Sequence, residues 1–232
     1  KYDLNKLAVI MTQTGGGCRA TNYVGFIRRA LEKAGMPQIP VISLNLGGIE
    51  TNPGFHLNAE MLMRVAYAAL FGDIFMRCVY ATRPYEAVAG STDELHEKWK
   101  KEVIAFITQK KMLSHGKFKK MCREIIRDFD NLPRKDIKKP RVGVVGEILV
   151  KYMPLANNHV VDLLEREGAE AVVPDLLDFF AATIYEQDFK HTHLGKGWTA
   201  SATAKLGIPA LQRMRRPAIE ALKASKRFTP PM

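Results

Sequence analysis

The sequence predicts an α/β protein in which strand–helix–strand units are joined to additional helices. The first unit is expected from an apolar segment at 7–12, a helical pattern at 21–34 and a second apolar segment at 39–44. The same order recurs in the segments 141–146, 157–168 and 169–174. Because two strands joined by a helix pair in parallel, each stretch predicts a small parallel βαβ unit.

The residues between these two units predict helices. Apolar residues recur at helical spacing over 57–75 and again between Trp99 and Phe129. Ser91 and Glu94 have the spacing of a capping box, which predicts that Ser91 caps the helix that follows it.

The segment 131–140 is polar and bounded by prolines, which is typical of a connector. We therefore expect two domains. Residues 1–133 would form an α/β unit with a helical extension, and residues 134–232 a second α/β unit. The second domain is expected to end in helices at 175–185 and 199–225.

The composition is typical of a globular protein. Of the 232 residues, 47% are hydrophobic and 25% are charged. No apolar stretch reaches the roughly 20 residues that a membrane helix needs, and no signal peptide opens the chain, so we expect a cytoplasmic protein without membrane contact. Because the chain opens almost directly on its first strand, we also expect it to be part of a longer protein.

Positive charge is concentrated in one region. The formal net charge is +11, and residues 98–141 contain 15 Lys or Arg against 5 Asp or Glu. Apolar residues alternate with these charges at helical spacing, which indicates the solvated faces of amphipathic helices. A nucleic acid is not the expected partner, since no groove-reading motif or stacking platform accompanies the charge.

The glycine-rich segment before Cys18 is the strongest candidate for a functional site. Thr14, Gly15, Gly16 and Gly17 follow the first predicted strand, and Cys18 precedes the predicted helix. Glycines let the backbone approach a bound group, and the free amides of a helix start favour an anion or a thiolate. Cys18 is therefore a candidate nucleophile or metal ligand. The alternative is a plain turn with a buried cysteine, because glycines also serve turn geometry alone.

The three cysteines are widely separated, which argues against a disulfide framework and against a self-contained Cys-x-x-Cys metal site. Cys78 lies within an apolar helical pattern and is expected in the core. Cys122 is expected to have a packing role or to lie at the surface, and not to be a reactive thiol.

Two further sets of polar residues have plain structural alternatives. Glu147 and Asp175 follow predicted parallel strands and could act as acid or base, but carboxylates in such places are more often helix caps. His191 and His193 are expected to lie in a loop and to bind no metal.

Five segments of the chain form a recognisable set: MTQTGGGCRATNY at 11–23, PVISLN at 40–45, RPYE at 83–86, KPRVGVVGEILV at 139–150 and VVPDLLDFF at 172–180. Together they resemble the 2-hydroxyacyl-CoA dehydratase activase-related proteins, and the resemblance spans nearly the whole chain. In that family, an ATP-hydrolysing activase part is often joined to regions that look like the dehydratase subunits. This chain is similar to a dehydratase-like region.

The resemblance implies flavodoxin-like units with parallel sheets and an oxygen-sensitive [4Fe-4S] cluster. In anaerobic metabolism, this cluster serves single-electron chemistry on acyl-CoA thioesters. Cys18 matches a cluster-ligand position, and the companion cysteine is expected upstream of Lys1. The cluster is therefore expected in the full-length protein and is expected to be absent or incomplete in this chain, which would be inactive alone.

The resemblance also implies a cavity for the cofactor and the CoA substrate. Its expected lining residues are Thr14, Gly15, Gly16, Gly17, Arg19, Asn22 and Tyr23, with Asn45 and Glu147 as further candidates.

Two other functions are open. A noncatalytic docking or scaffold domain would present the basic region 98–141 to an activase or dehydratase partner and would not depend on Cys18. A thiol enzyme would use Cys18 with Arg19 and with a histidine brought close by folding, either His56 or His159.

Overall fold

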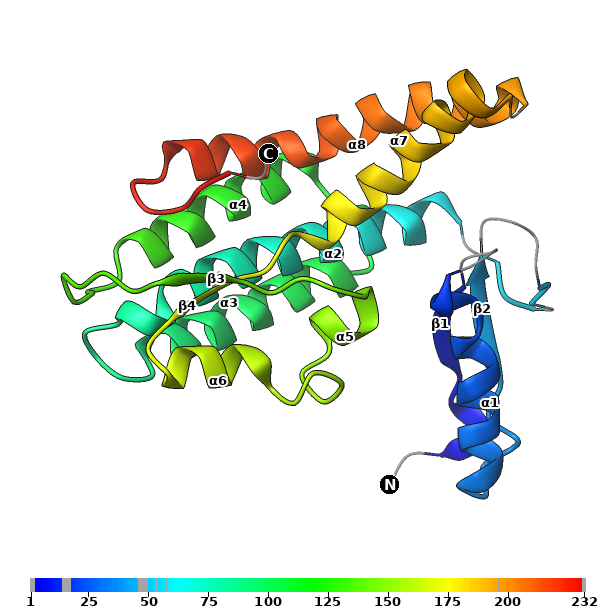
Figure 1. Cartoon of the computed structure of the whole chain (residues 1–232), viewed down its shortest axis with the longest axis horizontal. Helices are drawn as coiled ribbons and strands as arrows, with labels where there is room; N and C mark the ends of the chain where they lie inside the picture. Colours follow the sequence, from blue (N-terminus) through cyan, green and yellow to red (C-terminus); the bar gives the residue numbers. More distant parts are fainter. Residues whose placement is uncertain are drawn as a thin grey trace. The chain divides into compact units, whose positions relative to one another are not determined.

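The computed structural model describes residues 3–13, 18–45, 50–52, 54–56, 58–195 and 197–230, without the side chains of residues 45, 187, 199, 200 and 203. The chain divides into two compact units, residues 1–59 and 60–232. Within the described residues, the protein is mixed α/β and has two small sheets, each of two parallel strands (Figure 1). The predicted α/β class is thus confirmed. The flavodoxin-like arrangement is not confirmed, because it requires a single larger parallel sheet.

The first unit contains one strand–helix–strand element, close to the predicted positions. Strand β1 (Val9–Gln13) pairs in parallel with β2 (Val41–Asn45), and α1 (Tyr23–Lys33) contacts both strands. Short 3-10 helices lie at Leu4–Lys6 (η1) and Arg19–Thr21 (η2). Val24 of α1 is fully buried, whereas Ile10 of β1 is half exposed. The sheet therefore has one apolar residue facing away from its buried side.

The second unit is mainly helical. Its helices are α2 (Ala59–Tyr80), α3 (Ser91–Thr108), α4 (His115–Asp130), α5 (Ile148–Tyr152), α6 (Val160–Arg166), α7 (Leu176–Leu194) and α8 (Trp198–Ala224), with the 3-10 helix η3 at Arg83–Tyr85, and its strands are β3 (Arg141–Gly143) and β4 (Glu170–Val172). The two strands pair in parallel, and each is shorter than the sequence predicts. The helices at 91–108 and 115–130 confirm the two helices expected up to Phe129.

Helix α2 lies at the centre of the hydrophobic core of this unit, in contact with residues of α3, α4 and α8. The rings of Tyr67 and Phe118 stack with centroids 4.3 Å apart, and Phe71 meets the edges of Phe106 and Phe118. The Tyr67 hydroxyl lies 3.1 Å from Nδ1 of His115, so the polar atom of this ring cluster also has a hydrogen-bond partner. Such an interlocked aromatic core gives α2 a fixed position.

Polar groups fix the start of α7 against α2. The carboxylate of Asp73 accepts hydrogen bonds from the amides of Leu176 (2.8 Å) and Leu177 (3.1 Å), which are among the amides that a helix leaves unpaired at its start. Nearby, Asp175 pairs with Nε of Arg77 at 2.5 Å and lies 3.7 Å from the buried Arg215 of α8. Asp73 and Asp175 are thus linked to α7 and α8 by directed contacts.

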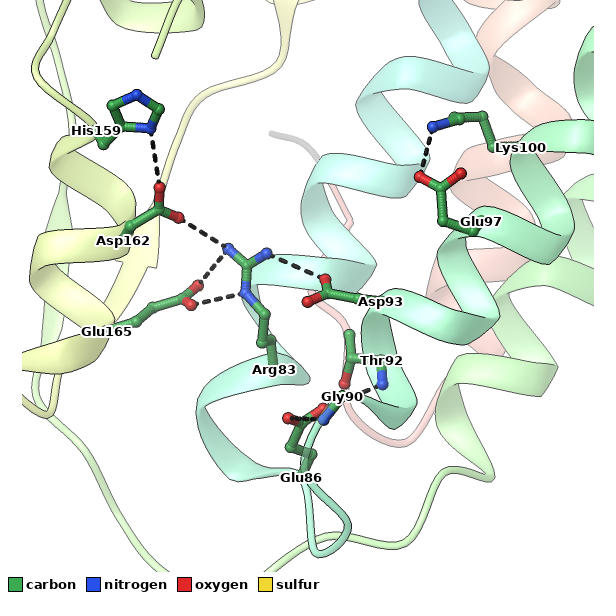
Figure 2. A network of polar contacts seen from close by, with 10 residues as sticks. All are labelled: Arg83, Glu86, Gly90, Thr92, Asp93, Glu97, Lys100, His159, Asp162 and Glu165. Atoms are coloured by element: carbon green, nitrogen blue, oxygen red, sulfur yellow. Dashed lines mark hydrogen bonds and ion pairs between the residues drawn. The ribbon is translucent and has the colours of Figure 1, made fainter. Parts of the chain in front are cut away.

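Arg83 holds α6 beside η3 and α3 (Figure 2). Its guanidinium group donates to both carboxylate oxygens of Glu165, at 2.7 and 3.1 Å, and contacts Asp93 at 3.2 Å and Asp162 at 3.7 Å. Glu165 is largely buried, and burial raises the pKa of its carboxyl group while Arg83 opposes that rise. One arginine therefore carries most of the polar contact between these elements.

The structure corrects two expectations about local structure. Ser91 does not cap α3, because Gly90 is the capping residue and the carboxylate of Glu86 accepts from the amides of Gly90 (2.7 Å) and Thr92 (3.0 Å). His191 and His193 lie in the last turns of α7 and not in a loop, since the helix continues to Gly195, which ends it in the left-handed conformation.

The boundary expected between residues 133 and 134 lies inside the second compact unit. There the connector is paired with the turn that follows α2: the amide of Ala87 donates to Pro133 O at 3.0 Å, and the amide of Lys135 donates to Tyr85 O at 2.7 Å. A proline-bounded polar segment can therefore serve as an extended packing strand as well as a linker.

The buried Asp73 makes stability depend on pH. Burial, and secondarily the neighbouring Asp175, raise the pKa of Asp73 to about 6, against the two amide hydrogen bonds that lower it. The folded state therefore binds this proton more tightly than the unfolded state does, and the free energy of unfolding falls as the pH rises from about 4 to about 6. We expect Asp73→Asn to remove up to about 3 kcal/mol of this decrease, measured by urea unfolding across the range.

Asp136→Asn is the matched control, because Asp136 is exposed. It should leave the pH dependence unchanged. If the free energy of unfolding changed equally with pH in wild type and in Asp73→Asn, the assignment of this pH dependence to Asp73 would be contradicted.

Candidate functional site

Cys18 lies where the chain enters the first helical turn after β1. It is exposed and precedes η2, with its carbonyl oxygen accepting from the amide of Thr21 at 3.2 Å. The turn continues through Asn22 into α1, where the amide of Phe26 donates to Asn22 O at 3.0 Å. The thiol is thus accessible and stands at the amino-terminal end of a helical segment, as the sequence predicts.

The residues predicted around Cys18 are only partly described. Arg19 and Asn22 are exposed, Tyr23 is half-buried, and all three lie within the turn that begins at Cys18. Thr14, Gly15, Gly16 and Gly17 lie outside the described residues, so their role in binding a cofactor stays a prediction. The side chain of Asn45 also lies outside them.

A buried polar network fixes the ends of β1 and β2 near this turn. The hydroxyl of Ser43 donates to Oε1 of Gln13 at 2.6 Å, and Nε2 of Gln13 donates to Thr21 O at 2.9 Å. Asn52 makes two hydrogen bonds with the backbone of Ser43, accepting from its amide at 2.9 Å and donating to its carbonyl at 2.7 Å. Gln13 therefore ties the end of β1 to the turn that follows Cys18.

An ion pair extends this network to α1. Nη2 of Arg28 lies 2.6 Å from Oε2 of Glu50, and the hydrogen bond from Arg28 lowers the pKa of Glu50. The ion pair therefore ties Glu50 to α1. Sequence reasoning missed Gln13, Ser43, Asn52 and Glu50. For Gln13 and Ser43 the available signal was polar residues within or at the end of two mainly apolar strands, and Glu50 and Asn52 follow the second strand.

The other two cysteines lie in the core of the second unit. Cys78 and Cys122 are fully buried among the packed helices, and burial raises the pKa of both thiols. The prediction of a core position for Cys78 is confirmed, as is the packing role for Cys122.

A cluster site is not complete in the described part of the chain. There, no group of three or more His, Cys, Asp or Glu side chains is placed to hold a metal ion. Cys18 offers one thiol, and four thiolates usually hold a [4Fe-4S] cluster. The described residues therefore do not by themselves fit an intact cluster.

Glu147 and Asp175 serve structural roles in the second unit. Oε2 of Glu147 accepts from the amide of Val150 at 3.1 Å and caps α5. Asp175 precedes α7 and is held by Arg77 and Arg215. Glu147 therefore follows the helix-cap alternative, whereas the carboxylate of Asp175 forms ion pairs and makes no capping hydrogen bond. His159 pairs with Asp162 at 3.1 Å, so it too has a local partner.

A basic groove runs between α4 and α8. It is lined by Lys119, Arg123 and Arg127 from α4 and by Arg213, Arg216 and Lys223 from α8. Glu220 lies in it and pairs with Arg216 at 2.7 Å and with Lys119 at 3.7 Å. Cations outnumber carboxylates along this groove, so it favours an acidic partner.

Comparison with known proteins gives no further guide to this site. No protein-family model, curated protein or solved structure matches the chain. Within the described ranges, no helix has the length and apolar character needed to cross a membrane.

Exposure predicts that the three thiols differ in reactivity. We expect a thiol reagent such as iodoacetamide to modify Cys18 in the native protein and to spare Cys78 and Cys122, which are shielded and disfavour the thiolate. Peptide mass spectrometry after brief alkylation measures this directly, and denatured protein, in which all three thiols react, is the control. Equal native labelling of the three cysteines would contradict the structure.

Proposed function

We propose that this chain is a dehydratase-like segment of a 2-hydroxyacyl-CoA dehydratase activase-related protein. Cys18 supplies one thiolate to a [4Fe-4S] cluster, and the remaining ligands come from outside the described residues. The observation that carries the proposal is the exposure of Cys18 at the entrance to a helical turn, beside the end of a parallel strand. The resemblance of the segment at 11–23 supports the same role.

The proposal requires a more specific fold than the α/β class alone. The elements β1–α1–β2 and β3–α6–β4 would each belong to a flavodoxin-like unit, with further strands beside those described. The half-exposed Ile10 on β1 supports this part of the proposal, because a larger assembly would cover such a side chain. The protein would act in the cytoplasm of a cell that uses anaerobic acyl-CoA chemistry.

Residues of the turn have defined roles in this proposal. A cluster would supply single electrons for chemistry on an acyl-CoA thioester. The amides at the start of η2 and the guanidinium group of Arg19 would favour negative charge on the Cys18 sulfur. The hydrogen bonds of Gln13 to Ser43 and to Thr21 would hold the turn in place, so that the thiolate has a fixed position.

Anaerobic reconstitution tests the proposal. This chain and a version extended upstream are treated with iron and sulfide, and iron content, sulfide content and electron paramagnetic resonance are measured. We expect a cluster in the extended protein that is lost in Cys18→Ala. Cys122→Ala is the matched control, because it removes a thiol that lies in the core. A cluster that survives Cys18→Ala, or no cluster in either protein, would overturn the proposal.

The basic groove supports a second candidate function, a docking module for an activase or dehydratase partner. Its cations come from two helices in contact, α4 and α8, so their spacing is fixed by the core. We expect association to weaken with added salt, and the double variant Arg123→Glu, Arg213→Glu to bind the partner at least about tenfold more weakly. Cys18→Ala should bind normally. Association that is indifferent to both salt and charge reversal would exclude this function.

A further inference from the structure

A cavity of about 270 Å³ in the second unit is lined by four arginines. It lies between the end of α2, strand β4 and the chain segment that follows α8. The arginines are Arg77, Arg134, Arg141 and Arg227. Side chains with apolar surface complete part of the lining, among them Met76, Tyr80 and Val173. The cavity therefore combines a strongly basic portion with an apolar portion.

Two of the four arginines are neutralised by carboxylates. Nε of Arg77 pairs with Asp175 at 2.5 Å, and Nε of Arg141 pairs with Oε1 of Glu170 at 2.9 Å. The second oxygen of Glu170 accepts from the hydroxyl of Tyr85 at 2.8 Å. Glu170 is the carboxylate in the lining, and both of its oxygens are already engaged.

Among the described residues, the other two arginines have neutral partners in place of a carboxylate. The guanidinium group of Arg134 stacks over the ring of Tyr85, 4.4 Å from its centroid. Nη1 of Arg227 donates to the carbonyl oxygens of Leu132 (2.9 Å) and Phe129 (3.4 Å). In the part of the chain that the structure describes, no carboxylate oxygen lies within the 4.0 Å ion-pair distance of either group.

These two arginines also repel each other. Burial, and after it the charge of Arg134, lower the pKa of Arg227. The charge of Asp130 opposes this decrease without cancelling it, so two like charges still face one cavity. A ligand that carries two negative charges would neutralise both guanidinium groups, whereas a ligand with a single negative charge would leave a net charge of +1 on the pair.

We propose that the cavity binds a phosphate monoester, with the phosphoryl group between Arg134 and Arg227 and the esterified group against the apolar lining. A phosphate monoester is close to a dianion at neutral pH, and the planar fork of arginine matches its oxygens with paired hydrogen bonds. The apolar lining formed by Met76, Tyr80 and Val173 suits an organic substituent. This site is independent of Cys18 and of the cluster.

Calorimetric titration of the whole chain tests the proposal with three probes: inorganic phosphate, phenyl phosphate and benzoate. We expect one saturable site per chain for phenyl phosphate, with weaker binding of inorganic phosphate, which lacks the apolar group. Benzoate carries the same ring and one charge, and it should bind at least about tenfold more weakly than phenyl phosphate. Cys18→Ala should bind all three probes as wild type does.

Variants assign the binding to the arginines. Arg134→Gln should weaken phenyl phosphate binding by at least about tenfold, and Arg134→Lys should recover part of the loss, because it restores the charge without the fork. Arg166→Gln is the matched control, since it removes the same charge from an exposed position on α6 outside the cavity. Circular dichroism checks that each variant is folded.

The proposal is overturned by any of three results: no saturable binding of phenyl phosphate, equal weakening by Arg134→Gln and Arg166→Gln, or benzoate binding as tight as that of phenyl phosphate. Should Arg134→Gln fail to fold, Arg227→Lys takes its place. It retains the charge and loses the fork, and wild-type affinity in that variant would likewise overturn the proposal.

Discussion

The burial of α2 is the constraint on which the larger unit depends. Its apolar side chains occupy the centre of the core, and α3, α4 and α8 pack around it. The same helix carries Asp73 and Arg77, whose polar contacts reach the start of α7 and Asp175. Helix α2 thus has two roles in the larger unit. Its apolar side chains fix its own position in the core, and its polar side chains fix the place where α7 begins.

Paired and unpaired arginines play different parts in this molecule. Arg83 and Arg215 lie against carboxylates in partly or fully buried places, where removing one partner would leave an isolated charge. Arg134 and Arg227 are held by an aromatic ring and by carbonyl oxygens, and these contacts do not neutralise them. The excess positive charge of the chain is therefore not uniform: part of it stabilises the fold, and part faces solvent or a cavity.

The sequence predicts local features well and tertiary ones poorly. The helices near Trp99 and Phe118 follow from apolar spacing, and the place of Cys18 follows from the strand before it and the helix after it. The cap of α3 was missed because Glu86 lies four residues before Gly90 and its side chain reaches forward across a turn. The hydrogen bond of Gln13 to Ser43 depends on strand register, which the apolar pattern leaves open.

The arginine-lined cavity has no local sequence signal. Its arginines are separated by up to 150 residues, since Arg77 comes from α2 and Arg227 from beyond α8. Only the packing of the helices brings them to one place. The contacts of the polar segment 131–140 are equally hidden, because it is typical of a linker by composition yet pairs with Tyr85 and Ala87.

The contacts of Arg83 bear on how cooperatively the second unit unfolds. Strands β3 and β4 share three residue pairs, and an isolated two-stranded sheet of that size is not stable in water. Helix α6 contacts β4 and is attached through Glu165 to Arg83 (Figure 2), and Glu170 of β4 accepts from Tyr85, so the segment from β3 to β4 owes much of its order to a few contacts with side chains outside it. That segment is thus a candidate for a subglobal unit of unfolding, able to exchange its amide hydrogens while the core around α2 remains closed.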